Sequence, residues 1–259
     1  MGQLDKKVAL VTGSAHSIGK AISLGLAREG ADMIIADMDV EGLNKTAGEI
    51  TALGVRVLPV ETNVMEEEQI EALFAKGMEK YKRVDILVNC AGIFNGGPID
   101  QLATETWDAV LSTNLRAPFL CTRAAFGIMK AQGGGRIINI SSISAKRPRM
   151  FNAPYSTAKA GLVGLTLSTA LEGREYGITC SVLYPGEVTR DRPPAMPPGM
   201  TPPPGATFEP PPPEATMSTD EIAAAVVYMA ACPPHVNVLE LTQIPIAQPY
   251  LGRGLGRIF

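Results

Sequence analysis

The chain has 259 residues, of which 46% are hydrophobic and 19% are charged, and its formal net charge at pH 7 is −3. This length predicts one large domain with a full core, and the weak negative charge gives no reason to expect binding to nucleic acid or to an anionic membrane surface. We expect a cytoplasmic protein, because no apolar run reaches the roughly 18 residues of a membrane-spanning helix and the first strand-like run starts too early to leave room for a signal peptide.

Strand-like apolar runs alternate with helical patterns along the whole chain. The runs lie at residues 7–11, 33–36, 55–60, 84–88, 136–140, 178–183 and 237–246. Strands that alternate with helices in this way predict an α/β fold. We predict a Rossmann-like, doubly wound parallel β-sheet with helices on both faces, formed by residues 1–259 as a single domain.

A turn of small residues follows the first run. Thr12 to Gly19 has the sequence Thr-Gly-Ser-Ala-His-Ser-Ile-Gly, and a helical pattern begins directly after it. Small residues let the backbone approach a pyrophosphate, and a helix N-terminus offers free N–H groups and the positive end of the helix dipole. This pattern predicts a phosphate-binding turn that includes Gly13, Ser17, Ile18 and Gly19. The alternative is a tight turn that binds no ligand.

An acidic residue ends the second run. Asp37 stands where a carboxylate accepts hydrogen bonds from both ribose hydroxyls of an adenosine, and a carboxylate there repels a 2′-phosphate. Position 16 is histidine where an arginine or lysine would favour a phosphate, and Asp37 is followed by Met38 and Asp39. These residues favour NAD over NADP as the cofactor. The alternative is that Asp37 only caps the next helix.

A proline interrupts the helical pattern in the middle of the chain. Pro118 lies four residues after Asn114 and has no N–H to donate to the Asn114 carbonyl. We expect a kink there that leaves this carbonyl free to accept a hydrogen bond from water. The alternative is a helix break without a functional role.

Three side chains in the second half of the chain suit proton and hydride chemistry. Tyr155 and Lys159 lie one helical turn apart, so the ammonium can lie beside the phenol. An unperturbed phenol has a pKa near 10, and a nearby cation lowers it. Lowering the pKa of the phenol to about 7 takes roughly 4 kcal/mol, which an ammonium and a nicotinamide cation together can supply. Ser142 ends the strand-like run that extends from Ile137 to Ser142, and its hydroxyl can bind the reacting oxygen.

In this order the motifs resemble those of the short-chain dehydrogenase/reductase family, in its compact branch, over nearly the whole chain. The family's T-G-x-x-x-G-x-G matches Thr12 to Gly19, with Ser17 in place of the middle glycine, and its Y-x-x-x-K matches Tyr155 and Lys159. The other matches are N-N-A-G at Asn89 to Gly92, the helix asparagine at Asn114, the serine at Ser142, and the P-G turn with its later threonine at Pro185, Gly186 and Thr189. Asn63, before Val64, replaces the family's aspartate after the third strand.

The resemblance implies a role for each matched residue. Tyr155 is the general acid/base, Ser142 orients the substrate oxygen, and Lys159 holds the nicotinamide ribose and lowers the pKa of Tyr155. Asn114 completes the catalytic set by supporting a water that links Lys159 to solvent. The implied cofactor-binding residues are Gly13, Ser17, Ile18, Gly19, Asp37, Asn63, Val64, Asn89, Ala91, Gly92, Tyr155, Lys159, Pro185, Gly186, Val188 and Thr189. We expect cofactor binding to survive the changes at Ser17 and Asn63.

The segment after the P-G turn is unusually rich in proline. Residues 193–213 hold eleven of the 21 prolines, so no regular helix can form there. In the resembled family this region is the substrate lid, and we predict a proline-rich substrate flap at 190–216 in its place. A tolerated surface insertion is an equal alternative, and a docking site for a partner is a third.

The remaining candidates for the substrate pocket form a mostly neutral set. They are Phe94, Ser144, Met150, Phe151 and Glu187. This mix predicts a small neutral alcohol or ketone. Arg147 and Arg149 leave a carboxylate contact open, although a solvated loop is the preferred interpretation. Cys90, Cys121, Cys180 and Cys232 lack metal-ligand spacing and predict reduced thiols and no metal site.

These observations predict an NAD(H)-dependent oxidoreductase that interconverts a secondary alcohol, or a hydroxy acid, and its ketone. An NADPH-dependent ketoreductase is the alternative within the same chemistry, and a non-catalytic nucleotide-binding regulator is the alternative from another class. Family resemblance implies a homotetramer, with a dimer as second choice. The apolar faces of the helices near 105–130 and 155–172, and the tail at 252–259, are the expected interfaces.

Overall fold

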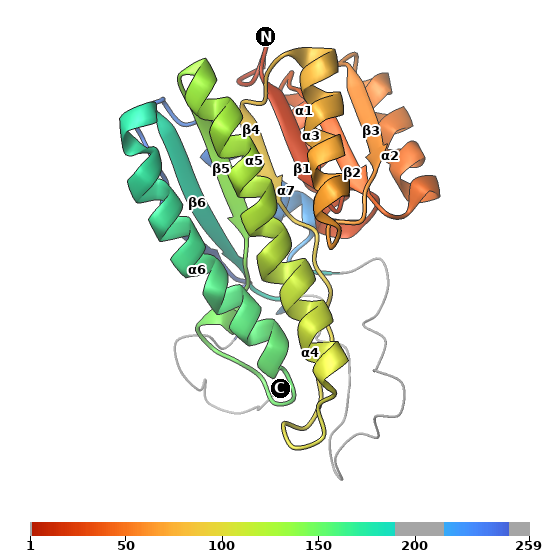
Figure 1. Ribbon diagram of the computed structural model, residues 1–259, viewed down its shortest axis with the longest axis vertical. Coiled ribbons are helices and arrows are strands. Elements are labelled where there is room, and N and C mark those ends of the chain that lie inside the picture. Colours follow the sequence, from red (N-terminus) through yellow and green to blue (C-terminus); the bar gives the residue numbers. More distant parts are fainter. Residues whose placement is uncertain (1, 190–214, 249–259) are drawn as a thin grey trace.

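A computed structural model describes residues 2–189 and 215–248 of the chain (Figure 1). Nearly all of the predicted flap at 190–216 and the whole tail at 252–259 lie outside the described residues. The two ends that flank residues 190–214 meet, because Val188 forms a parallel bridge with Met217. The Thr189 N–H donates to the Met217 carbonyl at 2.8 Å, and the Met217 N–H donates to the Glu187 carbonyl at 2.9 Å.

A parallel β-sheet of seven strands forms the centre of the molecule. The strand order is β3-β2-β1-β4-β5-β6-β7, which confirms the predicted doubly wound arrangement. The strands are β1 (Val8–Thr12), β2 (Asp32–Asp37), β3 (Val57–Glu61), β4 (Ile86–Asn89), β5 (Gly135–Ile140), β6 (Ile178–Pro185) and β7 (Glu240–Gln243). Every residue of β1 and β4 is buried, as expected for strands that are covered on both faces. The run predicted at 237–246 forms a shorter strand, β7.

Helices cover both faces of the sheet (Figure 1). One face carries α1 (Ser17–Arg28), α2 (Val40–Ala52) and α7 (Thr219–Ala231). The other carries α3 (Glu67–Tyr81), α4 (Thr104–Leu111), α5 (Ala117–Gln132) and α6 (Ala153–Gly173). Two short 3₁₀ turns, η2 (Ile143–Ala145) and η3 (Arg174–Tyr176), precede and follow α6. Each face has its own apolar core, so the sheet is held in place from both sides.

A single π turn, η1 (Ser112–Arg116), joins α4 to α5. The Ala117 N–H donates to the Ser112 carbonyl, one residue further back than in an α-helix. Pro118 follows in the first turn of α5, where its missing N–H disrupts least. The predicted disturbance near Pro118 therefore takes the form of a π turn, and this turn contains Asn114.

The carboxyl ends of the parallel strands meet along one edge of the sheet. β1 is hydrogen-bonded to β2 on one side and to β4 on the other, so the strand order reverses at β1. A crevice at such a reversal is where open α/β sheets bind ligands. Within the described residues, no helix is long and apolar enough to cross a membrane.

Candidate active site

A cavity of about 440 Å³ lies along this edge of the sheet. Its walls come from the loops after β1, β2, β4, β5 and β6 and from the start of α6. Most of the predicted site residues line it: Gly13, Ser17, Ile18, Gly19, Asp37, Val64, Ala91, Gly92, Phe94, Ser142, Ser144, Tyr155, Lys159, Pro185, Gly186, Glu187 and Val188. The cavity therefore joins the predicted phosphate-binding turn to the predicted catalytic side chains.

The turn between β1 and α1 brings the helix N-terminus against the end of the strand. Gly13 has a φ of 74°, in the left-handed region that favours glycine. A Cβ on Gly19 would overlap the Gly13 carbonyl, so both glycines are needed for this close approach. No side chain caps the start of α1, and the N–H groups of its first turn have no acceptor within the helix. These donors face the cavity and suit a pyrophosphate.

Ser17 explains why the resembled family has glycine at this position. Its φ is 47°, also in the left-handed region, where a side chain costs roughly 1–2 kcal/mol. The serine lines the cavity nevertheless. Serine in place of glycine at position 17 therefore costs conformational free energy at this one residue.

Two carboxylates lie close together after β2, and the first of them, Asp37, lines the cavity. Asp37 accepts hydrogen bonds from the backbone N–H groups of Ala15, at 2.9 Å, and Asp39, at 3.1 Å. Asp39 caps α2 by accepting from the Gly42 N–H at 3.1 Å, so Asp37 is not the helix cap. The His16 ring lies 2.5 Å from the Asp39 carboxylate. Hydrogen bonds from Gly42 and His16 lower the pKa of Asp39.

Ser142, Tyr155 and Lys159 meet at the other end of the cavity. Lys159 is almost fully buried and donates from Nζ to the Ile140 carbonyl at 2.8 Å. Its Nζ lies 5.5 Å from the centroid of the Tyr155 ring, and the Phe94 ring meets the same ring edge-on at 5.2 Å. The Ser142 hydroxyl accepts from the Ser144 N–H at 3.1 Å, which orients it at the start of η2.

Burial changes the acid–base properties of this end. Burial lowers the pKa of Lys159 from its ordinary value of 10.5 to about 8. Burial also raises the pKa of the neighbouring Cys90 thiol to about 12, so the thiol is not a nucleophile near neutral pH. All four cysteines are free, as predicted.

Four of the predicted catalytic and cofactor-binding residues are not part of the cavity lining. Asn114 is fully buried, accepts from the Ile93 N–H at 2.8 Å and donates to the Ile93 carbonyl at 2.7 Å, which fastens the loop after β4. Asn89 is buried and donates to the Asn139 side chain at 2.8 Å. Asn63 accepts from the Met65 N–H at 3.0 Å, and Thr189 pairs with Met217. Their predicted ligand contacts remain predictions.

The expected substrate residues separate into two groups. Phe94, Ser144 and Glu187 line the cavity. Met150 is 80% exposed, and neither it nor Phe151 is part of the lining. The reason lies in the turn before α6, where Phe151 has a φ of 61° and its carbonyl packs against Gly96. This turn directs Asn152 and Arg149 to the cavity instead.

Arg149 and Asn152 are lining residues that the sequence interpretation did not select. Arg149 was assigned to a solvated loop, yet it lines the cavity and forms a 2.7 Å ion pair with Glu187. Asn152 lies three residues before Tyr155, and that spacing on a helix face was the available signal. Among residues 2–189 and 215–248, no group of three or more metal-ligating side chains is present.

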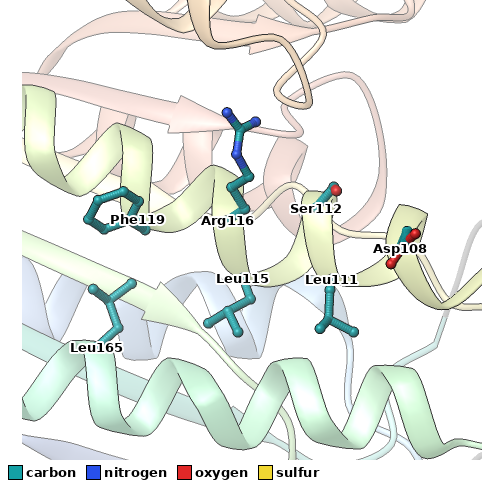
Figure 2. Close-up of a pocket in the computed structure, with 7 residues that line it drawn as sticks. All are labelled: Asp108, Leu111, Ser112, Leu115, Arg116, Phe119 and Leu165. Atoms are coloured by element: carbon teal, nitrogen blue, oxygen red, sulfur yellow. The ribbon is translucent and has the colours of Figure 1, made fainter.

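A second hollow, of about 620 Å³, lies on the outer side of the helical layer. Figure 2 shows Leu111 and Leu115 pointing toward α6, and Leu165 pointing back from that helix. Phe119 lies in the same groove and is 46% exposed. The groove occupies the helix faces that the sequence predicted as an interface.

Comparison with known proteins identifies the family of this chain. A family model described as short chain dehydrogenase matches residues 7–193. The chain belongs to the short-chain dehydrogenase family. The motifs of this family at Thr12 to Gly19, Ser142 and Tyr155 to Lys159 all fall within the matched residues.

Several relatives of this short-chain dehydrogenase are oxidoreductases by name. The chain is 40% identical to the uncharacterized oxidoreductase YxjF of Bacillus subtilis over 183 residues, or 71% of each chain. It is 36% identical to a 3-oxoacyl-[acyl-carrier-protein] reductase of Synechocystis over 192 residues, covering 74% of this chain and 78% of that one. The alcohol dehydrogenase of Thermococcus sibiricus, solved with 5-hydroxy-NADP, superposes with a TM-score of 0.82 at 27% identity, over 93% of this chain and 97% of that one.

Proposed function

We propose that the protein is an NAD(H)-dependent oxidoreductase that interconverts a secondary alcohol and its ketone. The observation that carries this proposal is the buried Lys159 beside Tyr155, in one cavity with Ser142 and with Asp37 at the opposite end. Acid–base chemistry, an anion-binding helix N-terminus and a ribose-binding carboxylate are thereby joined in a single crevice.

The residues fit a nicotinamide dinucleotide. The first turn of α1 would hold the phosphates, Asp37 the adenosine ribose, and Lys159 the nicotinamide ribose. When bound, the nicotinamide supplies or accepts the hydride. Tyr155 gives its phenolic proton to the carbonyl oxygen during reduction and takes it back during oxidation. The Ser142 hydroxyl donates to that oxygen, and the Lys159 ammonium stabilises the phenolate.

Preference for NAD over NADP rests on the charges at the ribose end. A 2′-phosphate there would meet the Asp37 carboxylate directly and would lie near Asp39. The nearby His16 is already engaged by Asp39 at 2.5 Å, so it is not free to pair with a phosphate. The carboxylates of Asp37 and Asp39 repel the negative charge of a 2′-phosphate, and the His16 ring, which already contacts Asp39, does not offset this repulsion.

An NADPH-dependent ketoreductase is the second candidate. The 3-oxoacyl reductase of Synechocystis and the Thermococcus structure with 5-hydroxy-NADP favour it. Both candidates use Tyr155 and Lys159 in the same way. They differ in whether the end of the cavity at Asp37 accepts the 2′-phosphate of NADP.

The groove between α4–η1–α5 and α6 supports a homotetramer, with a dimer as the second choice. Its three leucines and the exposed Phe119 would be covered by a second copy of the chain. We propose the cytoplasm as the place of action. Sedimentation of the purified protein distinguishes monomer, dimer and tetramer.

Titration of the purified protein with NADH and with NADPH, followed by nicotinamide fluorescence, tests the cofactor proposal. We expect NADH to bind at least ten-fold more tightly than NADPH, and Asp37→Ser to reduce that ratio. A panel of secondary alcohols with NAD then tests the reaction. Tighter binding of NADPH would favour the ketoreductase, and binding of neither cofactor would refute both candidates.

A further inference from the structure

One ion pair of the described chain has both of its partners in the cavity lining. The Arg149 guanidinium donates to the Glu187 carboxylate, with 2.7 Å between Nη2 and Oε2. Both residues line the cavity that also contains Ser142 and Tyr155. The two charges therefore face any substrate that enters, although neither takes part in the proton transfer.

The two partners come from different loops at the substrate end. Arg149 lies between η2 and α6, in the segment that joins Ser142 to Tyr155. Glu187 lies in the loop after β6, two residues beyond the end of that strand. The ion pair thus connects two loops that are about 40 residues apart in the chain.

The backbone of Glu187 is held on both sides. Its N–H donates to the Gln248 side-chain oxygen at 2.8 Å, and its carbonyl accepts from the Met217 N–H at 2.9 Å. The Glu187 side chain is 22% exposed, whereas that of Arg149 is 60% exposed. A carboxylate that is fixed in the fold reaches Arg149 without the loss of translational freedom that a dissolved carboxylate suffers on binding. Glu187 therefore outcompetes a substrate carboxylate for the guanidinium.

The charges at this end favour an uncharged substrate. A guanidinium matches a carboxylate in shape and charge, so Arg149 without Glu187 would suit the carboxylate of a keto acid. Lys159, the other cation of the lining at this end, is buried and bonded to the Ile140 carbonyl. A substrate carboxylate would meet a guanidinium that is already paired and would be repelled by Glu187. An uncharged carbon chain meets a pair without net charge.

We propose that Glu187 is a specificity-determining residue that occupies Arg149 as an internal carboxylate, so that the enzyme accepts uncharged ketones and rejects keto acids. Arg149 is thus a carboxylate-binding site that the chain itself keeps filled. This inference rests on the proposed function and adds the charge class of the substrate. It makes the exclusion of acids depend on one side chain.

The test uses two keto acids, each with an uncharged ketone that has the same number of non-hydrogen atoms. Acetoacetate is compared with 4-methyl-2-pentanone, and levulinate with 5-methyl-2-hexanone. In Glu187→Gln we expect the ratio of kcat/KM, keto acid over ketone, to rise roughly 10-fold for at least one pair. This is the lower end for a charge-assisted hydrogen bond, because Arg149 is largely exposed.

Two further variants show whether the gain comes from Arg149. Glu187→Ser also removes the charge and should give the same gain, and Arg149→Gln added to Glu187→Gln should cancel it. Glu49→Gln is the matched control, because it also removes one negative charge and one ion pair, with Lys20 at 2.8 Å, outside the cavity lining. An unchanged ratio for both keto acids in the two Glu187 variants, or a gain that survives Arg149→Gln, would overturn the inference.

A binding measurement separates this inference from the proposed reaction. Calorimetric titration of the two keto acids into Tyr155→Phe with bound NADH should show weak binding, and Glu187→Gln added to it should strengthen the binding of at least one roughly 10-fold. Absence of that gain contradicts the role of Glu187. Absence of turnover in the wild type, with the gain in binding intact, contradicts the proposed reaction alone.

Discussion

The two ends of the cavity are built in different ways. At the nucleotide end, the parts lie close together in the sequence: Gly13 and Gly19 form one turn, and Asp37 ends the neighbouring strand. At the substrate end, the parts come from distant loops. Gly96 packs against the Phe151 carbonyl, and the Asn114 side chain accepts a hydrogen bond from the Ile93 N–H.

This difference in construction separates specificity for the cofactor from specificity for the substrate. A turn with two required glycines permits little variation at those two positions. Loops that meet through one or two contacts can change their residues without disturbing the sheet. We therefore expect substrate preference to depend on the second end, where loop residues such as Arg149, Glu187 and Asn152 line the cavity.

Tyr155→Phe should give the largest effect, and it should affect one end only. We expect kcat to fall by about 100- to 10,000-fold, because the general acid/base is lost. NADH affinity should stay nearly the same, since the ring and its edge-on contact with Phe94 remain. Steady-state kinetics and fluorescence titration check the two parts. Tyr228→Phe, on the exposed side of α7, is the control. Retained activity in Tyr155→Phe would refute its role in proton transfer.

A matched pair of glycine variants tests whether the two ends are separable. A Cβ at position 19 would overlap the Gly13 carbonyl, and one at position 96 would overlap the Phe151 carbonyl. We expect Gly19→Ala to weaken NADH binding at least 10-fold, and Gly96→Ala to lower kcat/KM roughly 10- to 100-fold with NADH binding preserved.

Circular dichroism shows whether each variant has folded. Gly48→Ala, on α2 with no atom near the added Cβ, should affect neither end. Loss of cofactor binding in folded Gly96→Ala would mean that the two ends are coupled.

The turn from Gly13 to Gly19, Asp37 and Tyr155 were predicted as site residues from local signals, and they line one cavity. Apolar runs predicted the strands, and the order of motifs placed Asp37 and Tyr155 at the same edge of the sheet. The substrate end depends on which loops touch. Met150 was expected in the pocket, but the left-handed φ of Phe151 directs the chain so that Asn152 lines the cavity instead. Periodicity carries no information about such a turn.

Lys159→Met should stabilise the protein without cofactor while it removes activity. The pKa of Lys159 is about 8 in the fold and 10.5 ordinarily, so the folded state disfavours the charged form. Below pH 8 this costs about 3 kcal/mol, and the cost disappears as pH rises through 10.5. Loss of the bond to Ile140 costs about 1 kcal/mol. We expect a net gain of about 2 kcal/mol at pH 7 and none at pH 10, measured by urea unfolding.

The control for this pH dependence is Lys45→Met, an exposed lysine on α2. Its free energy of unfolding should follow that of the wild type between pH 7 and 10. A constant difference between Lys159→Met and the wild type over that range would mean that Lys159 is not held as a buried, destabilised cation.

Asp39→Asn should give the smallest effect, at the nucleotide end. Asparagine caps a helix as well as aspartate does, so α2 should keep its stability. The substitution removes one carboxylate near the expected ribose position, and with it the carboxylate oxygen that lies 2.5 Å from the His16 ring. We expect the Kd for NADPH to fall about 3- to 10-fold at low salt and less at high salt, because exposed charges are screened. Asp220→Asn, an exposed carboxylate at the start of α7, is the control and should change nothing. If Asp39→Asn also leaves NADPH binding unchanged, Asp37 alone determines the choice between NAD and NADP.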